Sequence, residues 1–215
     1  MNILALECSQ AHASVCLSKN GESVFCSDWT AARNHDEHLF PALAQALEKL
    51  ATEPLHLILV GAGPGSYGGV RVALAAAVGL STVKHSRMVA IGSWDDLAAD
   101  NGAYIVADAR RGGWTLRRPD GNISVVTSSE LQQEAANGTL LFSTESEQTM
   151  LSAGISAARC NVTPTAEGLI RSWLALSPSQ QEELAAKPAE PIYIRPPHIT
   201  EARHKPWEIK KQPKA

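Results

Sequence analysis

The chain has 215 residues, of which 44% are hydrophobic and 19% are charged, and this composition is typical of a folded globular protein. Its 19 Lys and Arg residues against 22 Asp and Glu residues give a net charge of -3, which disfavours a free-standing nucleic-acid binder, because such domains are usually basic. No apolar run approaches the about 20 residues of a membrane helix. The start, MNILALECSQ, has no basic segment before its apolar stretch, so we expect a first strand, no signal peptide and a cytoplasmic protein.

Three strands are predicted at the beginning of the chain. Apolar, β-prone runs cover 2–7, 12–18 and 22–28. Asn20-Gly21 separates the second run from the third, and this dipeptide between two such runs is a strong hairpin signal. The last two strands should therefore be antiparallel to each other.

A helix is predicted over residues 36–51, because apolar residues recur there at helical spacing. Pro54 ends this segment, and the short apolar run 55–60 predicts a buried strand. The glycine-rich segment GAGPGSYGG follows, and helical sequence resumes at Val70 and continues to about Thr82.

The second half of the chain also alternates between strand and helix patterns. Strands are predicted at 88–91, 103–108, 112–117, 122–126 and 139–142, and helices at 94–99, 128–136 and 165–176. From Pro188 onward the chain is rich in proline and lysine and should be extended. An opening meander followed by helical crossovers predicts an α/β fold.

The glycine-rich turn is a candidate phosphate site. Glycines let a ligand approach the backbone closely, and the helix that follows offers free N–H groups. The candidate residues are Glu7, Gly63, Gly65, Ser66 and Gly68, with Glu7 holding magnesium through water. The spacing fits neither a Walker loop nor a dinucleotide fingerprint. A tight turn that packs the helix against the sheet is therefore the alternative, with Glu7 as a turn residue.

The helix after this turn, VRVALAAAVGLSTV, lacks a polar face, since Arg71 is its only charged residue. Such a helix is covered on more than one side. One side can face its own sheet, and the other requires a second helix of this chain or another protein chain. Both alternatives remain open from the pattern alone.

Three other patterns carry weaker chemistry. His35 and His38 are three residues apart, whereas metal-binding pairs on a helix are usually four apart, so we expect no metal site there. The four cysteines form no Cys-x-x-Cys pair and are expected to be reduced thiols. The basic tail from Arg203, which includes Trp207, could contact RNA or could simply be solvated.

Five segments, taken in order, resemble one family. They are ILALECS at the start, RNHDEHLFP at 33–41, GPGSYGGVRVALAAAVGL at 63–80, DARRGG at 108–113 and YIRPP at 193–197. In these segments the chain is similar to the TsaB family, also called YeaZ, of the bacterial threonylcarbamoyladenosine pathway.

The resemblance implies an α/β fold of the actin-like and sugar-kinase-like (ASKHA) class, with two related lobes and mixed sheets. We therefore expect an N-terminal lobe over 1–100, a C-terminal lobe over 101–190 and an extended tail over 191–215.

The resemblance also implies a role without catalysis. Members of the family are paralogues of TsaD, which transfers a threonylcarbamoyl group to adenosine 37 of tRNA. They pair with a TsaD-type transferase, a TsaE-type ATPase joins the pair, and tRNA is met only through this complex. Homodimers use the same surface. Carried over to this chain, the surface consists of helices 36–51 and 69–83, with contact residues His35, His38, Leu39, Ala42, Ala46, Arg71, Leu74, Ala75 and Val78.

The resemblance makes a further distinction at the helix after residue 91. TsaD-like enzymes carry two metal-binding histidines there, and the matching positions in this chain are Ser93 and Leu97. Neither residue suits a metal, so we expect no metal, no catalytic residue, and neither transferase nor metalloprotease chemistry. The alternative is a small nucleotide-dependent phosphotransferase of the same fold, which would use Glu7 and the 63–69 turn for ATP and magnesium, or retain a vestige of that site.

Overall fold

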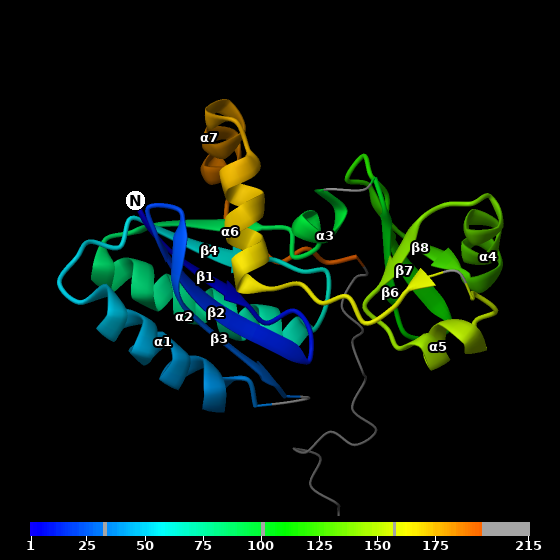
Figure 1. Ribbon diagram of the computed structural model, residues 1–215, viewed down its shortest axis with the longest axis horizontal. Helices are drawn as coiled ribbons and strands as arrows, with labels where there is room; N and C mark the ends of the chain where they lie inside the picture. The colour runs from blue at the N-terminus through cyan, green and yellow to red at the C-terminus, as the bar shows by residue number, and fades with distance from the viewer. Residues whose placement is uncertain (32–33, 100–101, 157, 195–215) are drawn as a thin grey trace, which may run out of the picture.

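The computed structural model describes residues 1–31, 34–99, 102–156 and 158–194. Two five-stranded mixed sheets, each with its own helices, form two lobes (Figure 1). None of the helices in the described residues is long and apolar enough to cross a membrane.

The first sheet has the strand order β3-β2-β1-β4-β5. Its strands are β1 (Asn2–Glu7), β2 (His12–Lys19), β3 (Glu22–Thr30), β4 (Leu57–Gly61) and β5 (Arg87–Ile91). The first three form an antiparallel meander, and β4 and β5 are parallel to β1. Asn20 and Gly21 both have positive φ, 54° and 91°, as the predicted hairpin requires.

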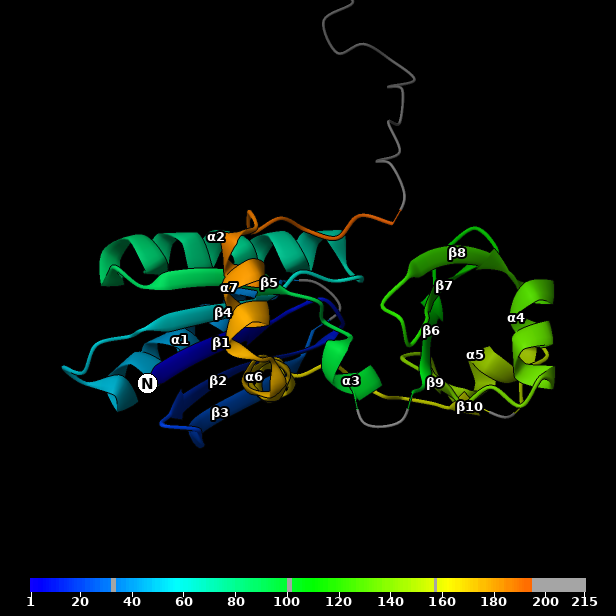
Figure 2. The same cartoon turned by 90° about the horizontal axis from the view of Figure 1, so that it is seen from above.

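Helices cover both faces of this sheet (Figures 1 and 2). On one face lie α1 (Asp36–Leu50) and α2 (Tyr67–Lys84), whose buried residues share one apolar cluster with β1, β2 and β4. On the other face lies α6 (Ala166–Ala175), where Ile170 and Trp173 join a cluster with Ile3 and Leu59. All six residues of β1 are buried, because this strand is sandwiched between the two layers of helices.

The second sheet has the order β10-β9-β6-β7-β8. Its strands are β6 (Tyr104–Asp108), β7 (Gly113–Arg117), β8 (Ile123–Thr127), β9 (Leu141–Ser143) and β10 (Ala158–Arg159). The helices α4 (Ser128–Ala136) and α5 (Glu147–Ser152) belong to this lobe, and the short α3 (Asp95–Ala99) precedes it in the chain.

The two sheets have the same topology. In each, an antiparallel meander supplies three strands, a fourth strand pairs in parallel with the first of them, and a fifth pairs in parallel with the fourth. This repetition confirms the predicted α/β fold with two related lobes of mixed sheets.

The packing differs from the expected division of the chain. Residues up to 190 were expected in the C-terminal lobe, but α6 and α7 (Pro178–Ala186) return to the first sheet. The N–H of Ala166 donates to Ser14 Oγ at 2.8 Å, and Arg87 pairs with Glu182 through two hydrogen bonds. These helices pack on the first lobe because the apolar side of α6 covers the second face of the first sheet, which would otherwise be exposed to water.

The end of the described chain runs beside the first lobe. The N–H of Ile192 donates to the carbonyl oxygen of Ala62 at 2.8 Å, so this segment lies on the glycine-rich turn. The predicted tail over 191–215 is described only as far as Ile194, and its basic part with Trp207 lies outside the described residues.

The expectation of four reduced thiols is wrong for one pair. Cys16 on β2 and Cys26 on β3 are directly opposite in the strand register and form a disulfide, whereas Cys8 and Cys160 are free. The pairing depends on the register of the hairpin, which cysteine spacing alone does not reveal.

Candidate functional site: an interlobe cleft and an outer helical surface

A cleft of about 720 Å³ lies between the lobes. The first lobe contributes the residues after β1 and the start of α2, and the second lobe contributes the ends of β6 and β9. The polar or charged residues that line it include Ser9, Gln10, Ser66, Tyr67, Asp108, Arg110, Thr144 and Glu145. Its position at the carboxyl ends of parallel strands is typical of ligand sites in α/β folds.

The glycine-rich turn is shaped by its contact with residues 7–9. A β-carbon on Gly61 would overlap the Glu7 carboxyl group, and one on Gly69 would overlap the carbonyl oxygen of Cys8. A β-carbon on Gly65 would likewise overlap the carbonyl oxygen of Ser9. These glycines therefore serve the close packing of α2 and β4 on the end of β1, which is the alternative that the sequence left open.

Only part of the predicted phosphate set reaches the cleft. Gly65 and Ser66 line it, whereas Gly63, Gly68 and Glu7 do not. The N–H of Gly63 is already taken by Ser93 Oγ at 3.0 Å. The side chain of Ser66 accepts the N–H of Gly69 at 3.3 Å and so caps α2. What remains for an anion is the first turn of α2, whose leading N–H groups have no acceptor within the helix.

Glu7 is fully buried beneath the turn. One carboxyl oxygen, Oε1, accepts the N–H of Ser9 at 2.6 Å, and Oε2 has no hydrogen-bond partner in the described residues. Burial raises the pKa of this carboxyl group, because removal from water disfavours the charged form. A magnesium ion in the cleft could not reach Glu7 without rearrangement of the turn, so the geometry does not favour the role that the sequence suggested for it.

The second lobe contributes charged residues from the DARRGG turn, which the sequence marked as a charged hairpin turn, and from Glu145, which the sequence did not place beside it. The Glu145 carboxylate accepts the N–H of Asp108 at 3.1 Å, and Asp108 accepts the N–H of Arg110 at 2.7 Å. Arg110, Arg111 and Gly112 all have positive φ, so DARRGG forms a tight turn between β6 and β7. The turn places one acidic and one basic side chain in the wall of the cleft.

Two tyrosines, Tyr67 and Tyr193, lie at the edge of the cleft. Of the two, only Tyr67 belongs to the glycine-rich turn, which the sequence analysis proposed as a phosphate site. The rings of Tyr67 and Tyr193 are 5.4 Å apart, and the Arg71 guanidinium lies 5.0 Å from the centre of the Tyr67 ring. Each tyrosine is more than half exposed. The position of Tyr67 between a predicted strand and a predicted helix could have indicated that it lies in a ligand site. Nothing in the sequence places Tyr193 beside it.

The positions compared with TsaD-type histidines hold no ligand set. Ser93 is buried and accepts the N–H of Gly63, while Leu97 packs against an apolar cluster that contains Trp94 and Ile105. Within the part of the chain that the structure describes, the one group of three potential metal ligands lies on the opposite side of the first sheet from α1 and α2, at Cys16, Cys26 and Glu167.

The outer surface of α1 and α2 differs from the predicted contact set. His35, Leu39, Ala42, Ala46 and Leu74 are all buried, and every one except His35 belongs to the core of the first lobe. Those predicted contacts are therefore corrected: the four core side chains support the fold, and His35 is buried at the wall of the interlobe cleft. His38, Arg71, Ala75 and Val78 are exposed, as a contact requires.

This outer surface also carries exposed apolar residues that the sequence analysis did not select. Phe40 on α1 is 55% exposed, and Val78 and Val83 on α2 are 50% and 74% exposed. Along α2, the outward residues Ala75, Val78 and Gly79 are small or apolar. We refer to the exposed residues Phe40, Arg71, Ala75, Val78, Gly79 and Val83 as the outer helical surface.

Comparison with known proteins supports the family resemblance. The sequence model of the family described as TsaD, tRNA N6-adenosine threonylcarbamoyltransferase, matches residues 29–128. The fold matches YeaZ from Pseudomonas aeruginosa with a TM-score of 0.64 and 21% identity, over 89% of this chain and 99% of that chain.

A second structure agrees. A protein from Pseudomonas aeruginosa described as similar to peptidase YEAZ matches with a TM-score of 0.67 and 23% identity, over 90% of this chain and 99% of its own. The sequence match agrees with the resemblance over residues 29–128, and the two structures show that the fold is shared.

Proposed function

We infer that this chain is a TsaB-type, YeaZ-like member of the tRNA-modification family, and that it acts as a non-catalytic subunit. In this proposal it binds a TsaD-type transferase and supports threonylcarbamoylation of adenosine 37 in tRNA. The observation that carries the proposal is the outer helical surface, because α1 and α2 cover the same face of the first sheet and both expose apolar or small side chains on their outer sides.

The outer helical surface fits a helical partner for a physical reason. Ala75 and Gly79 are one turn apart on the exposed side of α2, and side chains this small let a second helix approach closely. Phe40 and Val78 would lose water-exposed apolar area in the complex, which favours association.

The absence of catalysis is part of the proposal. Ser93 and Leu97 occupy the positions compared with the TsaD histidines, and one is engaged with Gly63 while the other packs in an apolar cluster. Catalysis of the transferase type would then reside in the partner. A TsaE-type ATPase would join this pair, and tRNA would contact the chain only through the assembly, in keeping with its net charge of -3. Such a complex would operate in the cytoplasm.

Co-purification tests the pairing. We expect the tagged chain to retain a co-expressed TsaD-type transferase, and Ala75→Arg to weaken this binding at least about tenfold, because the complex would have to bury an unpaired charge. Gln133→Arg on α4 is the matched control, since it adds the same charge at an exposed site of the other lobe. Undiminished binding by a folded Ala75→Arg variant would contradict the proposed surface.

The same variants test the function. Formation of threonylcarbamoyladenosine by the reconstituted system should require this chain, should be lost with Ala75→Arg and should persist with Gln133→Arg. Light scattering of the isolated chain adds a further check, because a homodimer through the outer helical surface should also dissociate in Ala75→Arg. Full activity without the chain would overturn the scaffold role.

The interlobe cleft favours a second candidate function, that of a small nucleotide-dependent phosphotransferase. The first turn of α2, together with Arg110 and the Tyr67 ring, offers groups that suit a phosphate and an aromatic base. Calorimetry with ATP and magnesium distinguishes the two functions. Micromolar binding by the isolated chain would favour the enzyme, and the scaffold requires none.

A further inference from the structure

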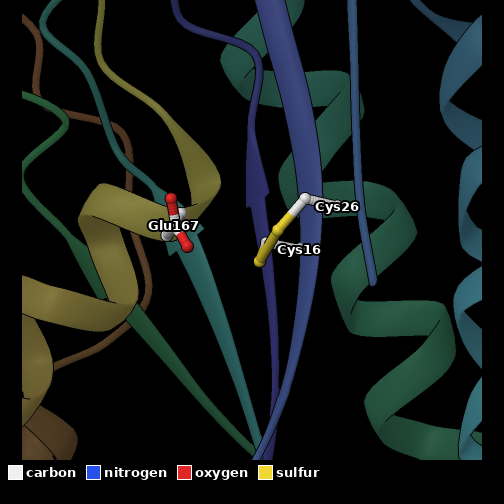
Figure 3. Close-up of side chains that lie close together, drawn as sticks. All are labelled: Cys16, Cys26 and Glu167. Atoms are coloured by element: carbon white, nitrogen blue, oxygen red, sulfur yellow. A yellow bond between two sulfur atoms is a disulfide. The ribbon is translucent and has the colours of Figure 1, made fainter. Parts of the chain in front are cut away.

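A cluster of two cysteines and one glutamate lies on the first sheet, far in sequence from the glycine-rich turn. Cys16 and Cys26 come from β2 and β3, and Glu167 is at the start of α6, which packs on the same face of the sheet (Figure 3). The two sulfur atoms and a carboxylate oxygen all lie within 4.8 Å of one another. Neither proposed function uses these residues.

The fold holds the three side chains together from both sides. Cys16 and Cys26 are directly opposite each other in the antiparallel register, so both side chains project from the same face. Glu167 is held there because the N–H of Ala166 donates to Ser14 Oγ on β2 at 2.8 Å. Ser23 Oγ donates to Glu167 Oε1 at 2.8 Å and lies 3.6 Å from Cys16 Sγ, so it links the carboxylate to the cysteines.

The chemistry of this donor set points to a thiophilic cation. Two thiolates and one carboxylate are ligands that Zn²⁺ takes in proteins, and water can complete a tetrahedral site. Cys16 is buried, whereas Cys26 and Glu167 are exposed, so an ion could enter from solvent at the outer edge of the sheet. Arg171 lies 3.5 Å from Glu167 and would offset part of the negative charge of the three ligands.

We propose that Cys16, Cys26 and Glu167 bind one Zn²⁺ ion when the disulfide is reduced. Reduction by a thiol or phosphine reductant adds two electrons and two protons to the sulfur–sulfur bond and yields two thiols. Binding of the ion then releases both thiol protons, so the affinity rises with pH. The disulfide and the metal site exclude each other, because the same sulfur atoms make both.

Metal titration of the full chain tests the site. We expect the reduced protein, kept without oxygen, to take one Zn²⁺ from a chromophoric chelator and, with Co²⁺, to show sulfur-to-cobalt charge-transfer absorption. Cys26→Ser should weaken Zn²⁺ binding by more than about 100-fold. Loss of a residue that only hydrogen-bonds to a metal ligand costs up to about this factor, and loss of a ligand should cost more. Oxidised protein should bind no ion at this place.

Two further variants decide which residues are ligands. Glu167→Gln should weaken binding while the sulfur-to-cobalt band remains, because both thiolates are still present. Cys160→Ser is the matched control and should leave binding unchanged, since Cys160 lies in the second lobe. The proposal would be overturned if Cys26→Ser bound Zn²⁺ as tightly as wild type does. It would also be overturned if Glu167→Gln had the same Zn²⁺ affinity as wild type. Circular dichroism confirms the fold of each variant, and Cys26 and Glu167 are chosen because both are exposed.

Discussion

The carbonyl oxygen of Ser9 stands where a β-carbon on Gly65 would have to be, and the same oxygen accepts the N–H of Ser66 at 2.6 Å. The end of β1 and the start of α2 are thus joined by direct backbone contact. This contact sets the position of Ser66 and Tyr67 in the wall of the interlobe cleft.

Gly65→Ala is predicted to destabilise the protein, because the added β-carbon would overlap the carbonyl oxygen of Ser9, and a backbone group cannot rotate away as a side chain can. The free energy of unfolding should fall by about 1–3 kcal/mol, as for other overpacked sites. Gly68→Ala is the control, since a β-carbon there meets nothing within 4 Å, and it should be neutral or stabilising by up to about 1 kcal/mol. Denaturant unfolding measures both. Equal stabilities of the two variants would show that the contact with Ser9 is relaxed easily.

Glu7→Gln is predicted to stabilise the protein in a pH-dependent manner. Burial raises the pKa of Glu7 in the folded chain above its ordinary value of 4.5, so ionisation is more costly in the folded than in the unfolded state. The contribution of Glu7 to the free energy of unfolding of the wild type is therefore fully present below pH 4.5. It is lost as the pH rises through the raised pKa of the folded chain.

Glutamine carries no charge and escapes this loss. The free energy of unfolding of Glu7→Gln should be higher than that of wild type at neutral pH and should match it below pH 4.5. Urea unfolding across this pH range provides the measurement. A variant that is less stable than wild type at neutral pH would indicate that the ionised carboxylate is required in the folded chain.

Local signals in the sequence predicted β1 to β9 and five of the seven helices in the described residues, whereas the two-residue strand β10 and the short helix α5 were not predicted. Asn20-Gly21 predicted the hairpin because a tight turn needs positive φ at both positions. The start of α2 was placed too late, at Val70, since the cap formed by Ser66 brings Tyr67 into the helix. The helix α7 was not predicted: it has no buried residue, although Ser177, Pro178 and Gln180 are a recognisable helix start.

The contact surface shows why site residues were harder to predict. Helical spacing identifies the apolar stripe of α1 and α2, but that stripe packs on the sheet, and the opposite stripe is the one open to a partner. Leu39 and Ala75 illustrate the two sides. The wall of the cleft depends on residues such as Tyr193 and Glu145, which only the fold brings near the glycine-rich turn.

Leu74 and Ala75 are neighbours in α2 with predicted effects of different kinds. Leu74 is 8% exposed and belongs to the core, so Leu74→Ala should lower the free energy of unfolding by about 2–5 kcal/mol. The affinity of the folded fraction for a TsaD-type partner should hardly change. Ala75→Arg should leave the free energy of unfolding nearly unchanged and should weaken the affinity for the partner. Unfolding and binding measurements on both variants distinguish the two effects. Loss of affinity in folded Leu74→Ala would mean that the partner reaches the core side of the helix.

The cysteines are predicted to react at very different rates once the protein is reduced. Cys8 is buried with no exposed surface, and burial, with the nearby Glu7, raises the pKa of its thiol. A thiol must lose its proton to attack an aromatic disulfide reagent, so Cys8 should stay unlabelled in the folded chain. Cys26, on the exposed edge strand, should react quickly.

Mass spectrometry of peptides from the labelled protein assigns each site. Addition of denaturant should expose Cys8, and its labelling rate then reports how often the end of β1 opens. Cys8→Ala serves as the control, because it removes this slow phase and leaves the labelling of Cys26 unchanged. Rapid labelling of Cys8 without denaturant would show that the contact between residues 7–9 and the glycine-rich turn opens readily, and the interlobe cleft would then have a movable wall.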